Sequence, residues 1–291
     1  MERQHHPYRA TAFMLTATVF FCLSDVLGKW LTATYPVVQI TWMRSIFGAG
    51  ALLLAAALTS NLRALKTRRP VWHASRSIAS GIMVLGVFYG LKNIPLAEFV
   101  ALTFSVPFFI ALFSPWLLRE QVAKQSWIAI TLGFIGVLFV LRPTPDHFHL
   151  AHLTTLGMSL IISLMLISAR YLSTTETGWS LNFYLPVAAI VLLGYPALVY
   201  WIDPGNLDWA LFATLGVSQT IALGCYIEAL RLARAAVIAP LDYLRMIWTI
   251  IVGYLIWQEL PDPYTWTGII IIVASGIYIV RHSYVNRTEH A

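Results

Sequence analysis

Charged residues are scarce in this chain of 291 residues. Only 11% are Asp, Glu, Lys or Arg, whereas 58% are hydrophobic. A soluble domain usually carries about a quarter charged residues. A deficit of this size excludes an ordinary soluble protein with a large core, and it predicts a chain that crosses a membrane many times.

Cysteines and catalytic motifs are also scarce. Cys22 and Cys225 are the two cysteines, and both lie within apolar runs, which argues against a disulfide framework or a thiolate metal site. The chain has no Walker loop, no H-E-x-x-H and no G-x-S-x-G. We interpret the histidines of DHFHLAH (146–152) as a solvated loop, because a secure zinc site needs fixed geometry and further ligands. We therefore expect no enzyme activity, no cofactor and no metal.

Long hydrophobic runs are what the sequence has instead. A helix needs about 20 apolar residues to cross the hydrocarbon. The first run is a retained span rather than a signal peptide, because it is too long and carries Asp25 and Lys29. The fold class is thus an all-α membrane protein of ten transmembrane helices with short connections, near residues 10–31, 37–58, 75–92, 97–118, 126–141, 153–172, 181–201, 209–230, 236–257 and 265–281.

Lys and Arg residues gather on one side of this arrangement, including the run RALKTRR (63–69). The positive-inside rule then predicts that both termini are cytoplasmic, in a multi-pass protein of the inner membrane. We interpret the basic run as a loop near anionic lipid rather than as a nucleic-acid patch.

The two halves of the chain repeat each other. SWIAITLGFIGVLFVLR (126–142) matches TWTGIIIIVASGIYIVR (265–281). We expect a first repeat at 1–142 and a second at 153–281, with five helices each. Because five is odd, the second repeat must enter the membrane upside down, as in many secondary transporters.

Two such repeats, each ending in an apolar span, a Glu turn and a glycine-bearing last helix, resemble the EamA-type transporters of the drug/metabolite superfamily. The branch of S-adenosylmethionine uptake transporters is the most similar, through SDVLGKWL…YPVVQITWMRS (24–45), RRPVWHASRS…YGLKNIPLAEFVALTFSVPFF (68–109) and IAPLDYLRMIWTIIVGYLIWQELPD (238–262). The resemblance implies a ten-helix carrier with a central cavity. It implies S-adenosylmethionine or an amino-acid-like metabolite as substrate, with riboflavin or an aromatic amino acid as the alternative.

The stretch PLDYLRMIW (240–248) places Asp242 and Arg245 one helical turn apart inside an apolar run. A charge at the centre of a membrane helix costs about 2.5–3.5 kcal/mol. The pair either neutralises itself as a structural ion pair or lines a cavity and meets a charged or zwitterionic substrate. Trp248 falls on the same face, where a ring could stack on a cation.

Further charges lie in the first two spans. Asp25 and Lys29 are spaced for an ion pair along one helix, although Lys29 could instead extend to the membrane interface. Arg44 needs a partner from another helix, and Asp25 or Glu98 are the candidates.

The remaining candidates are aromatic or acidic. Tyr89 and Tyr226 correspond in the repeat, while Glu98 and Glu228 lie near span ends. We expect a small-molecule substrate and the lipid bilayer as partners, no nucleic acid, and a monomer or homodimer. Asp25, Glu98 or Asp242 could couple transport to protons, and exchange against a counter-substrate is the alternative. The candidate transport residues are Asp25, Lys29, Arg44, Tyr89, Glu98, Tyr226, Glu228, Asp242, Arg245 and Trp248.

Overall fold

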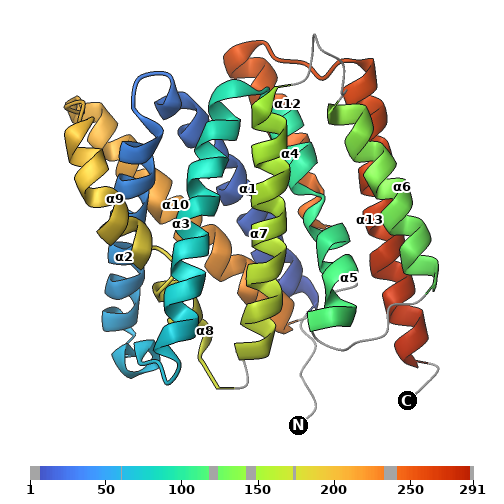
Figure 1. Cartoon of the computed structure of the whole chain (residues 1–291), viewed down its shortest axis with the longest axis horizontal. Helices are drawn as coiled ribbons and strands as arrows, with labels where there is room; N and C mark the ends of the chain where they lie inside the picture. The colour runs from blue at the N-terminus through green and yellow to red at the C-terminus, as the bar shows by residue number, and fades with distance from the viewer. Residues whose placement is uncertain are drawn as a thin grey trace.

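The computed structural model describes residues 7–59, 61–117, 124–141, 149–172, 175–232 and 241–288. Within these ranges the chain is helical and contains no strand (Figure 1). The helices are α1 (Pro7–Thr32), α2 (Val37–Leu58), η1 (Leu62–Leu65), α3 (Pro70–Asn93), α4 (Leu96–Thr103), α5 (Val106–Leu117), α6 (Lys124–Leu141), α7 (Leu150–Leu172), α8 (Gly178–Phe183), α9 (Val187–Val199), α10 (Asn206–Leu232), α12 (Leu244–Trp257) and α13 (Pro263–Thr288).

Six segments are long and apolar enough to cross a membrane, which confirms the prediction of an all-helical chain with several spans. They are Tyr8–Thr32, Val37–Leu58, Pro70–Asn93, Leu150–Ala169, Gly178–Val199 and Asn206–Ala229. Shorter apolar helices occupy the other predicted runs, at Leu96–Ile110, Thr131–Leu141, Leu244–Trp257 and Pro263–Ser275. The count of ten spans stays a prediction.

Two of the predicted continuous spans are broken. The run at 97–118 divides into α4 and α5 beside Pro107, and the run at 181–201 divides into α8 and α9 at Pro186. Proline lacks a backbone N–H and disfavours helical geometry in the residue before it, so these helices end and restart there. Hydropathy alone does not register such breaks.

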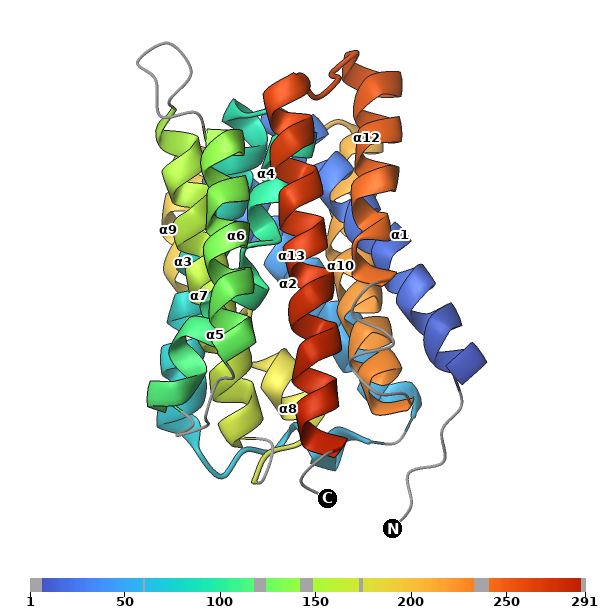
Figure 2. The ribbon, with the colours of Figure 1, turned by 90° about the vertical axis from the view of Figure 1, so that its right-hand side faces the viewer.

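The same helix contacts recur when each helix is replaced by its counterpart in the other half of the chain. α1 packs along α10 as α7 packs along α3, and α2 contacts α10 as α9 contacts α3. α6 and α13, the last helices of the two repeats, lie side by side (Figure 2). Their backbones touch, because a Cβ atom on Gly268 would lie 2.7 Å from the carbonyl oxygen of Gly136. Small residues permit this close approach between membrane helices.

The bundle has two distinguishable ends. α1 begins and α13 ends at the same end (Figures 1 and 2), which we call the terminal end. The opposite end, where α1 finishes at Thr32 and α13 starts at Pro263, is the far end. The predicted topology would place the terminal end in the cytoplasm.

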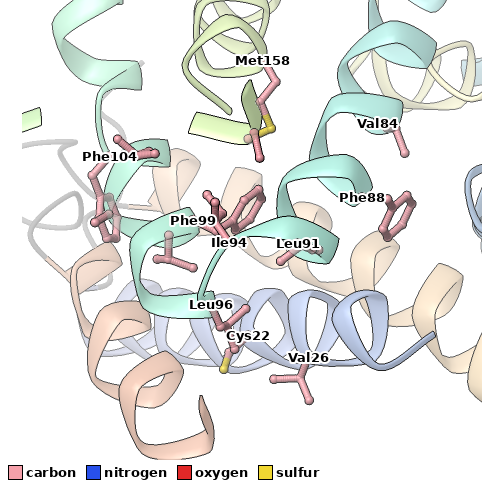
Figure 3. Packing of buried hydrophobic residues seen from close by; sticks show 14 of the residues in the cluster. Cys22, Val26, Val84, Phe88, Leu91, Ile94, Leu96, Phe99, Phe104 and Met158 are labelled. Atoms are coloured by element: carbon pink, nitrogen blue, oxygen red, sulfur yellow. The ribbon is translucent and has the colours of Figure 1, made fainter. Parts of the chain in front are cut away.

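The corner between α3 and α4 forms a packed core near the far end. Leu91, Leu96 and Phe99 are each no more than 1% exposed, and they gather beside Cys22 and Val26 of α1 (Figure 3). Within a bilayer such packing stabilises through van der Waals contact, because lipid tails are as apolar as the side chains. This packed core therefore holds α1, α3 and α4 together.

Candidate functional site

Asp25 and Arg245 form an ion pair between α1 and α12. Arg245 donates from Nε to Oδ2 of Asp25 at 3.1 Å, and its Nη2 donates to the same oxygen. The side chains are only 10% and 15% exposed, so both charges face protein rather than lipid. Pairing between the halves offsets the cost of placing either charge in a membrane span.

Asp242 does not pair with Arg245, in contrast to the spacing along the chain. A turn at Tyr243 separates Asp242, which is itself helical, from α12, which begins at Leu244. The structure gives the half-buried Asp242 carboxylate no hydrogen bond or ion pair to any residue that it describes. Asp242 remains within electrostatic range of Arg245 and of the hydroxyl groups of Tyr226 and Tyr243.

Arg44 extends the series of charges from α2. Its guanidinium lies 5.9 Å from the centroid of the Phe88 ring and within electrostatic range of Asp25. Of the two acids expected as partners, Asp25 bonds Arg245 and Glu98 bonds His152. The charges therefore alternate in sign from Arg44 through Asp25 and Arg245 to Asp242.

Aromatic rings surround these charges. The guanidinium of Arg245 lies 5.2 Å from the centroid of Phe21, and Phe21 meets Tyr226 edge to face at 6.1 Å. Phe104 and Tyr243 form a second ring pair at 4.9 Å. Phe21 was not among the residues predicted from the sequence, although its position four residues before Asp25 places the two side chains on one face of the helix.

The other aromatic candidates lie apart from this cluster. Trp248 is 39% exposed, and the ring that faces Arg245 is Phe21 rather than Trp248. Tyr89 is half-buried in α3 and has no ring contact with Tyr226, which packs on Phe21. Glu228 lies half-buried near the end of α10.

Lys29 pairs with Glu259 at the far end, not with Asp25. Its Nζ lies 2.7 Å from Oε1 and 2.6 Å from Oε2 of Glu259, and it also contacts the Ile94 carbonyl oxygen at 3.4 Å. The backbone N–H of Leu96 donates to Oε2 of Glu259 at 3.1 Å. We call this group, with Trp257 lying 5.1 Å from the Lys29 nitrogen, the far-end seal.

A sharp helix end places Glu259 in the seal. Gln258 has a φ of 57°, and its N–H donates to the Tyr254 carbonyl at 3.0 Å, as in an αL cap, while the Glu259 N–H donates to the Gly253 carbonyl at 3.2 Å. A non-glycine residue in this left-handed region costs about 1–2 kcal/mol. Glu259 belongs to the Glu turn that precedes the last helix of the second repeat, but it was not among the site residues predicted from the sequence.

Glu98 and His152 form a second polar link at the same end. The His152 Nε2 atom lies 3.1 Å from Oε2 of Glu98, joining α7 to α4, and the side chains are 6% and 18% exposed. His152 is therefore buried rather than solvated as the loop pattern suggested, while His147 lies outside the described residues. Among the residues that are described, no three His, Cys, Asp or Glu side chains form a metal-binding group.

Two grooves open on the flanks of the bundle. One, of about 340 Å³, lies between α12 and α13 and reaches Tyr243. The other, of about 350 Å³, lies between α3 and α9. Neither is lined by Asp25 or Arg245. The central charges contact one another here, so a ligand would have to separate them.

Known proteins similar to this chain are membrane transporters. An S-adenosylmethionine uptake transporter of Rickettsia prowazekii is 26% identical over 92% of this chain and 91% of that protein. A riboflavin transporter of Vibrio cholerae is 26% identical over 97% and 96% of the two chains. A pseudopaline exporter of Pseudomonas aeruginosa is 25% identical over 91% and 93%.

A solved protein structure has the same fold, with a TM-score of 0.67 and 18% identity over 96% of this chain and 98% of that chain. The family model of the EamA-like transporters matches residues 9–142 and again residues 149–281. The two matches together cover most of the chain and correspond to its two halves. The chain therefore belongs to the EamA-like transporter family and is a multi-pass membrane protein.

Proposed function

We propose that this protein is a secondary transporter of the bacterial inner membrane that moves a small organic metabolite by alternating access. In this proposal the halves are inverted five-helix repeats, with both termini in the cytoplasm. The observation that carries the proposal is the buried Asp25–Arg245 pair between α1 and α12, which belong to different family repeats. Such a bond is a natural point of exchange, because a charged substrate can replace either partner.

The charges favour a substrate that carries both signs. Arg44 and Asp242 have no ion pair with another described residue, so they are available to a carboxylate and to a cation. The rings of Phe21, Tyr226 and Tyr243 lie next to these charges and suit a planar group. S-adenosylmethionine joins an amino acid, a sulfonium cation and an adenine ring, and it is our first candidate.

Binding would proceed by exchange of partners. The substrate carboxylate attracts Arg44 and Arg245, and Asp25 then loses its bonds from Arg245. The free Asp25 carboxylate takes the cationic part of the substrate or a proton, with Asp242 beside it. The carboxylate and ammonium groups of an amino acid add no net charge to the bundle, whereas a sulfonium group or a proton adds one positive charge beside the Asp242 carboxylate. In this proposal protons couple through Asp25 or Asp242 within the exchange, or through Glu98 beside His152, and a counter-substrate is the alternative.

The far-end seal gives the two halves a point at which to separate. Lys29 and Glu259 close that end while Asp25 and Arg245 are paired. A transport cycle must break both ion pairs to open a path to the far side. The alternative substrates, riboflavin or an aromatic amino acid, would use the same rings. A membrane enzyme, the other class of function, has no observation in its favour.

The test uses purified protein in liposomes with labelled S-adenosylmethionine, riboflavin or tryptophan. We expect saturable uptake of S-adenosylmethionine, reduced at least tenfold by Asp242→Asn. Asp203→Asn is the matched control, because that carboxylate lies in an exposed loop and its one partner among the described residues is the Trp201 ring nitrogen. Uptake of riboflavin or tryptophan alone would show that S-adenosylmethionine is not the substrate. Chemical conversion of any of the three would contradict the assignment as a carrier.

A further inference from the structure

A narrow apolar groove runs along the flank of the bundle between α3 and α9. Ala74 and Ile78 of α3 form one wall, and Val191 and Leu192 of α9 form the other. Ile78 is 48% and Val191 is 69% exposed, so the groove opens toward the surrounding lipid. Its volume of about 350 Å³ can hold part of an acyl chain.

Cationic residues adjoin two of the residues that line this groove. Thr67 and Pro70 line it, and Lys66, Arg68 and Arg69 are their immediate neighbours in the chain. We call residues 66–69 the basic loop. Lys66 and Arg68 are exposed, and none of the three cations forms an ion pair within the described part of the chain.

The basic loop is held in a fixed shape by one buried carboxylate. Glu176 accepts hydrogen bonds from the Arg68 backbone N–H at 2.8 Å and from the Thr67 hydroxyl at 3.1 Å. The same carboxylate meets His73 at 3.3 Å and Ser180 at 3.0 Å. Within the loop these bonds use the Arg68 backbone and the Thr67 hydroxyl, so the guanidinium groups remain available to a ligand.

Arg69 is oriented as well. Its guanidinium lies 5.7 Å from the centroid of the Tyr171 ring at the end of α7. A stacked guanidinium loses less conformational freedom when it binds an anion, and its planar donor set matches a phosphate. The cations therefore form a prepared anion site beside an apolar groove.

We propose that this groove and the basic loop together bind an anionic phospholipid, with an acyl chain between α3 and α9 and the phosphate on Arg68, Arg69 and Lys66. A soluble phosphate would leave the groove unused, and a lipid without net charge would leave the cations unbalanced. Basic pockets between membrane helices on the cytoplasmic side bind anionic head groups for these reasons. The proposal is independent of which metabolite the protein transports.

Native mass spectrometry of the full-length protein in detergent tests the charge. The probes are phosphatidylglycerol and phosphatidylcholine with identical acyl chains. We expect phosphatidylglycerol to bind at least tenfold more tightly, and Arg68→Gln with Arg69→Gln to remove most of this preference, at roughly fivefold per cation. The matched control is Arg9→Gln with Lys92→Gln, which removes two exposed cations elsewhere.

A second pair of variants tests the groove. Ala74→Trp fills it from an exposed position, whereas Ser75→Trp adds the same ring at an exposed neighbour that does not line it. We expect only Ala74→Trp to weaken phosphatidylglycerol binding, by at least fivefold. Equal binding of the two lipids, equal effects of both tryptophans, or displacement of the lipid by glycerol phosphate at equal concentration would each overturn the proposal.

Discussion

The charges within this bundle find their partners across helices rather than along them. The spacing of Asp25 with Lys29, and of Asp242 with Arg245, suggested pairs within one helix. In the structure Arg245 bonds Asp25 and Lys29 bonds Glu259. Pairs at neighbouring positions of one helix contribute only about 0.2–0.5 kcal/mol, so a cross-helix partner with better geometry prevails.

A double-mutant cycle on Asp25 and Arg245 tests this pairing. We expect Asp25→Asn or Arg245→Gln alone to lower the free energy of unfolding by roughly 3 kcal/mol, because each leaves a buried charge without its partner. The double variant leaves no unpaired charge and should lose less than the sum of the two. Chemical unfolding in detergent measures all four proteins, and strictly additive losses would show that the two side chains do not interact.

At the scale of elements, turns and caps decide where the functional side chains lie. The left-handed Gln258 ends α12 and places Glu259 against Lys29. The connection before α3 depends in a similar way on Glu176, which accepts a hydrogen bond from the Arg68 backbone N–H in the basic loop. Burial raises the pKa of Glu176, but the hydrogen bonds from Arg68, His73, Ser180 and Thr67 outweigh this effect and lower the pKa overall.

The lowered pKa of Glu176 predicts a pH-dependent stability. A carboxylate with a lower pKa in the folded state stabilises fully above its unfolded pKa, here 4.5, and loses that contribution as the pH falls through the folded value. Glu176→Gln should therefore cost roughly 1–3 kcal/mol at pH 7 and less in acid below the ordinary range of Glu. Thermal unfolding in detergent at several pH values measures this difference.

Asp203→Asn again serves as the control for that experiment, because its carboxylate is exposed. We expect its melting temperature to follow the wild-type value throughout the pH range. A Glu176→Gln penalty that stays constant from neutral pH into acid would refute the assigned role of the ionised carboxylate.

At the scale of the whole molecule, polar contacts join the two halves near the far end, and the Lys29–Glu259 pair is one of them. Lys29 of the first half pairs with Glu259 of the second. Lys29 also donates to the Ile94 carbonyl, and the Leu96 N–H donates to Glu259. Both ends of a carrier must open in turn. In the proposed topology, with both termini in the cytoplasm, the far-end seal is therefore expected to govern access to the centre from outside the cell.

Cysteine labelling of intact cells tests this expectation. With Cys22→Ala and Cys225→Ala as background, Ile94→Cys introduces a reporter at a position that is only 4% exposed. We expect a membrane-impermeant maleimide to label it slowly, and Glu259→Gln to increase the rate at least fivefold. Asp203→Asn, at the same end, should leave the labelling rate unchanged. A rate that is unaffected by Glu259→Gln would show that the Lys29–Glu259 pair does not restrict access to Ile94→Cys.

Much of the fold could be predicted from composition and repetition. The apolar runs indicated membrane helices, and the matching segments 126–142 and 265–281 form α6 and α13, which pack on each other. Breaks at Pro107 and Pro186 were not predicted, because hydropathy averages over them. The contact of the Phe21 ring with Arg245 and the burial of His152 were also not predicted, since both depend on which helices become neighbours.

The sequence alone determined that this protein is helical, lies in a membrane and consists of two related halves, because the cost of exposing polar groups to hydrocarbon acts on every residue independently. It also predicted that charges deep within the spans avoid the lipid. Only the tertiary structure decided which charge meets which. Arg245 and Asp25 are 220 positions apart, and no local rule connects them, because their contact exists only after α1 and α12 have packed together.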